Sequence, residues 1–360
     1  MRKKQRILTS VVLGILIPAV SSLLALQSED FLQGKVHFID KPGLSLEQRA
    51  EAAFKEAGSG QLFLLGYLFD SRHGIRFGCD RDIAGNYTVR RKNNRIKISR
   101  RGSLSRSVST TKENRPAGLL LLRDGRQILD TSLLDPEQQY IFEDIPLYWV
   151  GEASAEESFA YLEKIFNKSE SNLQEELIFP LSIHNTSKTT PFLRNVGLGD
   201  YDFEVKKDAV FWLGNVKDSI SLNALKEIFS KSSHTELKKQ VVFAIQLSDQ
   251  ENAIQELIRI AKKESNREVK KSAIFWLGQK AGEECTAALK EVVESGEDTE
   301  LKKSAVFAIS QLPKDQAVPL LIDIAKTNKN PAVKKSAIFW LGQTGDEEAL
   351  KFFEDILLKK

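Results

Sequence analysis

Apolar and polar positions repeat with a fixed period over the second half of the chain. Residues 269–278 read Val-Lys-Lys-Ser-Ala-Ile-Phe-Trp-Leu-Gly. Closely similar stretches begin 32 residues apart (for example 269 − 237), at Val205, Leu237, Val269, Leu301 and Val333. A fixed repeat of about 20–50 residues is the signature of a solenoid, in which one small unit stacks on the next.

Each repeat is predicted to contain two helices. Val269, Ala273 and Leu277 are spaced at four residues and therefore share one face of a helix. Between these stretches lies a second amphipathic segment, whose leucines keep the same spacing: Leu225, Leu257, Leu289 and Leu321. Neither helix can bury its apolar face alone, so we expect neighbouring repeats to stack.

The residues at the predicted helix ends agree with this division. Pro331 suits a first helical turn. Thr235 and Thr299 are candidate N-caps. Glycines are expected to act as C-caps of the second helices at three positions: Gly214, Gly278 and Gly342.

A second period of 64 residues lies over the period of 32. After each phenylalanine the pair Trp-Leu alternates with Ala-Ile along the chain. We expect the Trp-Leu pairs to form the repeat core, with a smaller neighbour in the adjacent repeat accepting each tryptophan. These predicted core residues are Trp212, Leu213, Trp276, Leu277, Trp340 and Leu341.

Paired helices with Val-basic-x-x-Ala near the start of the second helix resemble HEAT repeats in their short bacterial form. Residues 305–343 are similar to a group of exported bacterial HEAT-repeat proteins of unassigned function. The resemblance covers residues 201–360 and extends in degenerate form to about residue 147. It implies a fold and says little about function. The family also uses Arg at the basic position, where every repeat of this chain has Lys.

Two domains and a leader are predicted. The fold class is an α-solenoid of stacked HEAT-like helix pairs preceded by a small α+β domain. The α+β domain spans residues 27–146 and the solenoid residues 147–360. Within the solenoid we expect degenerate first repeats over 147–200, regular repeats over 201–345 and a capping helix over 346–360.

Residues 1–26 have a basic start followed by an apolar run over residues 7–26. This pattern is typical of a signal peptide, and residues 19–21 (Ala-Val-Ser) would suit cleavage. The run is also long enough to cross a bilayer as an uncleaved anchor. In both cases we expect the remainder to be exported, either periplasmic or attached to the outer face of the inner membrane.

The pattern of residues 27–146 predicts strands and one helix. Ser45 and Gln48 form a capping box that opens a helix ending near Ala57. Asp124-Gly125 is the turn of a hairpin over residues 119–129. Further strands are expected over residues 35–39, 61–69 and 95–99.

Residues 90–115 are basic and then rich in serine, which predicts a loop between strands. One interpretation is a solvated loop, and the other is a patch for an anionic surface such as phospholipid headgroups or nucleic acid. The residues of this candidate patch are Arg90, Arg91, Lys92, Arg95, Arg100 and Arg101.

Composition and motifs give no support to an enzyme. The net charge is only +3, so nothing global attracts the chain to nucleic acid. None of the four histidines belongs to a His-Glu dipeptide, the iron-binding motif of the HEAT-repeat deoxyhypusine hydroxylases. Cys79 and Cys285 form no CxxC motif. Cys285 fits a buried position of a first helix. The alternative is a disulfide between the two domains in an oxidising compartment, for which the spacing gives no signature. We therefore predict no catalytic residue, metal, cofactor or small-molecule substrate.

The remaining candidate for a functional site is a repeated surface on the second helices. One lysine per repeat is expected to face away from the packed seam, and a phenylalanine follows it four residues later. Either the phenylalanines are core and the lysines pair with nearby carboxylates, or the lysines meet an acidic peptide or polymer. The lysine row comprises Lys207, Lys239, Lys271, Lys303 and Lys335.

The sequence favours a non-enzymatic scaffold of the bacterial cell envelope that binds an acidic protein or peptide in the solenoid groove. The first alternative is a nucleic-acid-binding protein that resembles the DNA glycosylases built from HEAT-like repeats. Export argues against that alternative. The second is a lyase resembling the phycobilin-attaching HEAT-like proteins, which rests on the fold alone.

Overall fold

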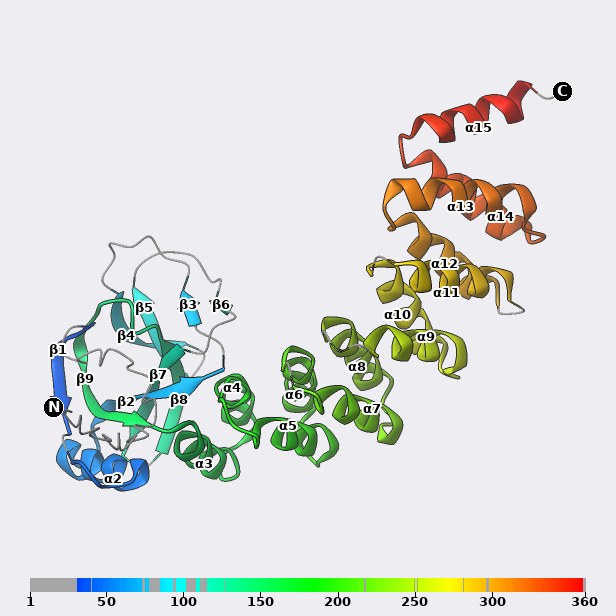
Figure 1. Cartoon of the computed structure of the whole chain (residues 1–360). Coiled ribbons are helices and arrows are strands. Elements are labelled where there is room, and N and C mark those ends of the chain that lie inside the picture. Colours follow the sequence, from blue (N-terminus) through cyan, green and yellow to red (C-terminus); the bar gives the residue numbers. More distant parts are fainter. Residues whose placement is uncertain are drawn as a thin grey trace, which may run out of the picture.

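The computed structural model consists of a small sheet domain followed by a curved array of paired helices (Figure 1). The predicted leader, residues 1–26, lies outside the residues that the structure describes. Within the described part of the chain, no helix is both long and apolar enough to cross a bilayer. The structure describes residues 31–39, 41–72, 75–77, 85–92, 95–101, 108–110, 115–125, 127–216, 218–248, 250, 252–280, 282–295 and 298–358.

The N-terminal domain is built on one curled sheet in the order β5-β4-β9-β2-β7-β8, and β1 also pairs with β9. Because β5 and β8, at the two ends of this order, contact each other, the sheet bends towards a barrel (Figure 1). The strands of the sheet are β1 Leu32–Phe38, β2 Leu62–Ser71, β4 Gly85–Lys92, β5 Arg95–Arg101, β7 Arg115–Asp124, β8 Gln127–Leu134 and β9 Tyr140–Ala153. A separate pair is formed by β3 Ile75–Phe77 and β6 Val108–Thr110.

The helix and the hairpin predicted in this domain are both present. The Ser45 hydroxyl accepts a hydrogen bond from the Gln48 amide, and the Gln48 side chain accepts one from the Ser45 amide. This capping box starts α2 (Leu46–Ala57). β7 and β8 are joined at Asp124-Gly125, where Gly125 has a φ of 56° that glycine adopts without strain.

The predicted basic loop is in part a strand hairpin. The loop prediction is wrong for residues 90–92 and 100–101, because β4 and β5 pair there in antiparallel register. The strand expected over residues 95–99 is confirmed as part of β5. Alternating apolar and polar residues favour a strand, and pairing satisfies the backbone polar groups. The six candidate patch residues lie on these strands: Arg90, Arg91 and Lys92 on β4, and Arg95, Arg100 and Arg101 on β5. Their side chains lie outside the description.

The domain boundary predicted at residue 147 falls inside β9 and is wrong. Leu147 and Trp149 pack in the core on one face of the sheet, and Tyr148 and Val150 pack in the core on the other. This alternation is the two-residue period of a strand buried on both faces. The first repeat therefore begins after β9.

The solenoid contains six helix pairs followed by one helix. The repeat prediction is confirmed, because the second helices α6 to α14 follow the 32-residue period. The pairs are α3 Ala155–Phe166 with α4 Ser171–Ser182, α5 Thr189–Leu198 with α6 Phe203–Asn215, α7 Ser221–Lys231 with α8 Thr235–Leu247, α9 Ala253–Lys263 with α10 Arg267–Gly278, α11 Glu283–Glu294 with α12 Thr299–Ser310, and α13 Lys314–Thr327 with α14 Pro331–Gly342. The expected final helix is α15 Glu347–Leu358.

The glycines of the second helices are not C-caps, so that prediction is wrong. Gly214 lies within α6, and Gly278 is the last residue of α10. A Cβ atom on Gly214 would lie 2.5 Å from the Ala244 carbonyl oxygen, and one on Gly278 would lie 2.6 Å from that of Ala308. Because glycine has no side chain, the second helices of neighbouring repeats can approach closely at these positions. In the 64-residue alternation, the glycine of a Trp-bearing helix thus lies against the alanine of the next, Ala-bearing helix.

The threonines predicted as N-caps have another role. Thr235 and Thr299 are the first residues of α8 and α12, and His234 and Asp298 are the caps. Each threonine hydroxyl instead accepts a 2.9 Å hydrogen bond from the asparagine that caps the next second helix: Asn266 to Thr235, and Asn330 to Thr299. These bonds link neighbouring repeats at the ends of their second helices.

One hydrophobic core joins the two parts of the chain. It runs from one face of the sheet through α3 and α4 to Phe352 of α15. At the joint, the Arg72 amide donates to the Ile183 carbonyl at 2.8 Å. The Arg72 guanidinium donates to the carbonyls of His184 and Thr186, each at 3.0 Å. The sheet domain and the solenoid therefore pack against each other directly.

Candidate interaction face

The lysine row lies on the second helices, one lysine per repeat. Four of its members pair with the glutamate three residues earlier: Lys207–Glu204, Lys239–Glu236 at 3.1 Å, Lys271–Glu268 at 3.2 Å and Lys303–Glu300 at 3.0 Å. Lys335 has Ala332 at that position and forms no ion pair with a described residue. The row is therefore a line of exposed ion pairs and not a strip of free positive charge.

Exposed pairs of this kind hold their partners weakly. Each contributes only about 0–1 kcal/mol to stability. The hydrogen bond that Lys207 donates to Glu204 raises the pKa of Lys207. Lys207 therefore stays charged at neutral pH. In each of these exposed pairs a competing carboxylate can replace the glutamate at little cost.

Aromatic rings form a second, continuous row beside the lysines. In Figure 1, α6 and α8 lie towards the inner side of the curved array, and α7 lies towards its outer side. We call these rings the aromatic row; its members are Phe179, Phe211, Trp212, Phe243, Phe275, Trp276, Phe307, Phe339 and Trp340.

Every neighbouring pair in the aromatic row is in contact. Between repeats, the ring centroids lie 4.4 Å apart for Phe179–Trp212, 4.8 Å for Phe243–Trp276 and 4.8 Å for Phe307–Trp340. Phenylalanines stack at 6.1 Å for Phe211–Phe243 and 6.3 Å for Phe275–Phe307. Within α6, α10 and α14 the adjacent Phe and Trp meet edge to face at 5.1, 4.9 and 5.0 Å.

The aromatic row is partly open to solvent. Phe275 is 37% exposed and Phe339 is 56% exposed, and the remaining rings are half-buried. The predicted core is therefore correct for Leu213, Leu277 and Leu341, which are fully buried. It is only half correct for Trp212, Trp276 and Trp340, which pack against the core and also belong to this surface.

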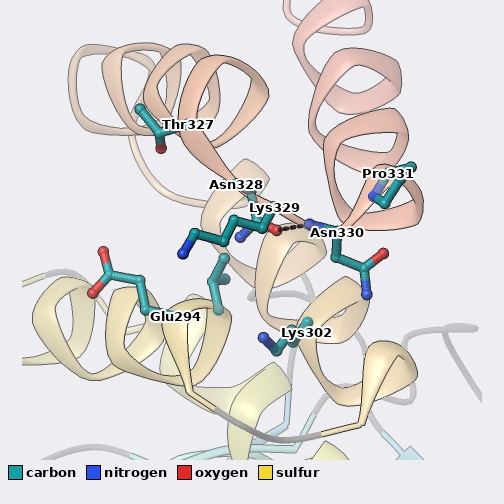
Figure 2. Close-up of a pocket in the computed structure, with 8 residues that line it drawn as sticks. Glu294, Lys302, Thr327, Asn328, Lys329, Asn330 and Pro331 are labelled. Atoms are coloured by element: carbon teal, nitrogen blue, oxygen red, sulfur yellow. Dashed lines mark hydrogen bonds between the residues drawn. The ribbon is translucent and has the colours of Figure 1, made fainter.

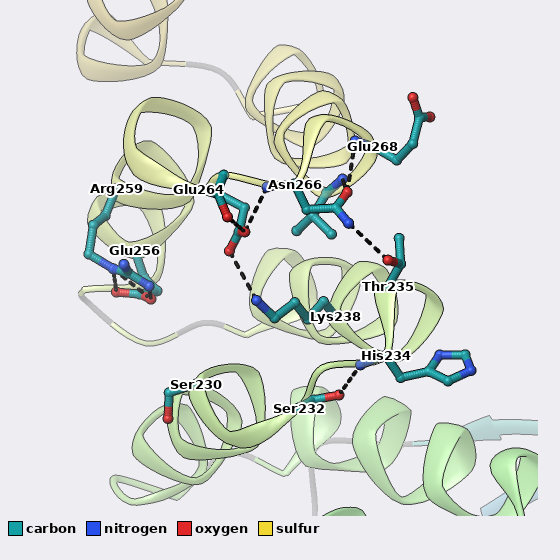
Figure 3. A network of polar contacts seen from close by, with 12 residues as sticks. Ser230, Ser232, His234, Thr235, Lys238, Glu256, Arg259, Glu264, Asn266 and Glu268 are labelled. Atoms are coloured by element: carbon teal, nitrogen blue, oxygen red, sulfur yellow. Dashed lines mark hydrogen bonds and ion pairs between the residues drawn. The ribbon is translucent and has the colours of Figure 1, made fainter.

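Sequence reasoning missed a second set of lysines, the first of each Lys-Lys pair. Lys206 donates to the Gly199 carbonyl at 2.9 Å, and Lys334 donates to the Lys326 carbonyl at 3.1 Å. Lys238 lies 3.3 Å from the Glu264 carboxylate (Figure 3). These lysines reach loops between helices. The only sequence signal for these contacts is that every repeat contains both lysines.

A buried polar group at the joint was also missed. The His184 Nδ1–H donates to the Pro180 carbonyl at 2.7 Å, which leaves Nε2 to accept from the Ser158 hydroxyl at 2.7 Å. The Tyr67 hydroxyl lies 3.1 Å from the same Ser158 oxygen. Burial lowers the pKa of His184 to about 3. All three side chains are fully buried, so this Ser–His pair meets no substrate and holds the joint together.

The remaining candidates for chemistry form no site among the described residues. Cys285 is buried, as expected, and it is free within the part of the chain that the structure describes. Burial raises the pKa of its thiol. Cys79 lies outside the described residues. Among the residues described, no three His, Cys, Asp or Glu side chains gather as a metal site would require.

Comparisons with known proteins bear on the repeats. A family described as HEAT repeats matches residues 286–360, which include α12, α13, α14 and α15. This part of the chain is similar to HEAT repeats. The helix pairs before it keep the same 32-residue spacing from α6 onwards, so the array from α6 to α14 is a HEAT-like solenoid.

Two solved structures are similar in part. Human deoxyhypusine hydroxylase, in complex with glycerol, is 22% identical; the match covers 56% of this chain and 78% of that one, with a TM-score of 0.26. The complex of CpcE and CpcF of phycocyanin lyase from Nostoc sp. PCC7120 is 13% identical, covering 56% and 80% with a TM-score of 0.32. At these TM-scores neither likeness carries an argument about function. No curated protein matches the chain.

Proposed function

We propose that this protein is a non-enzymatic scaffold that binds a segment of a partner protein along the second helices of its solenoid. The observation that carries the proposal is the aromatic row, an unbroken line of contacting and partly exposed rings from Phe179 to Phe339. Contiguous exposed apolar surface of this kind marks interaction sites. Aromatic side chains also contribute much of the binding energy at protein interfaces.

The chemistry beside the rings indicates the kind of partner. Lysines and their glutamates alternate along the row, so an extended acidic segment can place apolar side chains on the rings and carboxylates on the lysines. Lys335, which has no glutamate at the preceding turn, is the first anchor for such a carboxylate. The partner is thus an acidic peptide or protein surface with regularly spaced apolar residues.

The same geometry gives less support to nucleic acid. Binding of a phosphate backbone depends on cations that release counterions when they neutralise phosphates. Four lysines of the row already face carboxylates, which would repel phosphates. The lyase alternative finds no supporting observation among the described residues. The location in the cell envelope, with residues 7–26 as a possible tether, remains part of the proposal.

Binding by the aromatic row is tested with two exposed rings. Phe275→Ala and Phe339→Ala together remove apolar surface without opening the core, because neither partly exposed ring belongs to the buried core. Leu350→Ala on α15 is the matched control, since Leu350 is 58% exposed and lies outside the row. In quantitative affinity capture from envelope extract, the double variant should lose proteins that wild type and the control both retain. Equal recovery by all three proteins would refute the proposed face.

A further inference from the structure

The lysines that reach the loops between helices do not all have a partner. Lys238 of α8 lies between two groups, 3.3 Å from the Glu264 carboxylate and 4.8 Å from the centre of the Phe229 ring. Both groups are buried: 8% of the Glu264 side chain is exposed, and 4% of Phe229. Figure 3 shows Lys238 pointing at Glu264. The charge of Lys238 is thus neutralised within the array.

Lys302 of α12 occupies the equivalent position one double period later (302 − 238 = 64), and both partners are replaced there. Asn328 stands in the place of Glu264 (328 − 264), and Val293 stands in the place of Phe229 (293 − 229). The Lys302 ammonium group forms no hydrogen bond or ion pair with any residue that the structure describes. It therefore lacks both the carboxylate and the ring that flank Lys238.

The loop itself is unchanged by these replacements. The Asn328 side-chain oxygen accepts from the Asn330 amide at 2.9 Å, as the Glu264 carboxylate accepts from the Asn266 amide at 2.9 Å. Asparagine thus keeps the turn and removes the charge. The missing carboxylate is therefore not required for folding of this repeat.

A surface pocket of about 660 Å³ is lined by Lys302 and Asn328, among others. Its charged groups are the ammonium groups of Lys302 and Lys329 and the carboxylate of Glu294, a net charge of +1. Figure 2 shows Lys329 and Glu294 reaching towards the same opening from facing elements. Val293 is only 1% exposed and lies buried behind the pocket wall.

We propose that this pocket binds the carboxylate of an organic acid. The ligand carboxylate takes the place that Glu264 fills beside Lys238. A charge-assisted hydrogen bond from Lys302 gives the attraction. The pocket lies apart from the aromatic row, so this proposal does not rest on the proposed function.

The test uses 3-phenylpropionate as the probe and neutral 3-phenylpropanamide as its matched control. Ligand-observed NMR titration of the full chain at constant ionic strength measures both affinities. Two acetylated peptides that end in phenylalanine, one with a free carboxylate and one amidated, distinguish a polypeptide C-terminus from a small acid. Inorganic phosphate tests whether any anion is sufficient.

Saturable binding of the acid and not of the amide is expected. Lys302→Gln should weaken it about tenfold, as loss of a charge-assisted hydrogen bond predicts. Asn328→Glu should block binding of the acid by supplying an internal carboxylate. The control variant is Lys303→Gln, which changes the adjacent lysine of the lysine row and should leave binding of the acid unchanged. Glu264→Asn should create a second site beside Lys238. The proposal is overturned if acid and amide bind alike, if phosphate competes equally, or if the Lys302 and Asn328 variants bind as wild type does.

Discussion

At the scale of single residues, glycines set how closely the repeats stack. Gly214 and Gly278 leave room for the backbone of Ala244 and Ala308. Gly342 occupies the same position of its repeat, but the nearest atom to a Cβ built there is 3.9 Å away, on the Phe353 ring. Glycine at this position therefore allows a close helix contact in two repeats, whereas the third repeat has no such contact.

The same substitution should have opposite effects at these positions. Gly278→Ala forces its Cβ against the Ala308 carbonyl and should lower the free energy of unfolding by about 1–3 kcal/mol. Gly342→Ala makes only an ordinary van der Waals contact with the Phe353 ring and should be neutral or stabilising by up to about 1 kcal/mol, because alanine favours a helix. Urea denaturation of both variants measures the difference. Equal shifts in the two midpoints would show that the close contact does not exist.

Sequence reading succeeded for residues whose partners are near in the chain and failed where the partner is distant. The glutamate three residues before four lysines could be read directly from the sequence. The role of Gly278 could not, since a C-cap glycine and a glycine at a helix contact look alike until the neighbouring helix is placed. The contact of Phe179 with Trp212 likewise depends on how two repeats stack.

At the scale of elements, the repeats are not all equivalent. The Trp-bearing helices α6 and α10 pack their glycines against the Ala-bearing helices α8 and α12. The asparagine caps donate to threonines with the same alternation. The structural unit of the array is therefore two helix pairs, or 64 residues, and not one.

Two deletions distinguish these units. Deletion of residues 237–300 brings α12 to the place of α8, so Ala308 faces Gly214 and Asn330 faces Thr235. Deletion of residues 237–268 removes half as much chain but places Trp276 where Ala244 was. We expect the 64-residue deletion to keep the higher denaturation midpoint in urea. If the 32-residue deletion is equally stable or more stable, the alternation has no energetic meaning.

The elements themselves were largely predictable, and their arrangement was not. The 32-residue period predicted the helix pairs, and the capping box at Ser45 predicted α2. Nothing local reveals that β9 pairs in parallel with β1, β2 and β4, because such pairing joins residues far apart in the chain. For the same reason the boundary predicted at residue 147 wrongly separates Trp149 from the sheet.

At the scale of the whole molecule, the sheet domain and the solenoid meet at a buried polar joint. His184 lies at its centre, stacked on Phe69 of β2 at 4.1 Å and hydrogen-bonded to Ser158 of α3. The neutral form of the His184 imidazole can make both the stacking contact and the hydrogen bond. The joint therefore depends on the protonation state of one side chain.

This joint should make stability depend on pH. Burial lowers the pKa of His184 to about 3, whereas the unfolded chain has a pKa of about 6.5 at this residue. Between these values only the unfolded chain binds the proton, so the free energy of unfolding falls as the pH falls from about 6.5 towards 3. The slope for one group is about 1.4 kcal/mol per pH unit.

The variant His184→Gln isolates this contribution. It should be less stable than wild type at pH 7, because the hydrogen bonds to Ser158 and Pro180 change. Its stability should also fall less steeply than that of wild type between pH 6.5 and pH 4.5. Urea denaturation over this range measures both. Parallel curves for the two proteins would mean that His184 does not govern the pH response.

The central claim is that the aromatic row contacts a partner, and site-specific photo-crosslinking in the native host tests it most directly. A photoreactive phenylalanine analogue replaces Phe275 or Phe339 in the row, and Leu350 or Ile220 outside it, all being exposed side chains. The account predicts one crosslinked adduct of the same mass from both row positions and none from the two control positions. Absence of an adduct at both row positions, or equal adducts at row and control positions, would contradict it.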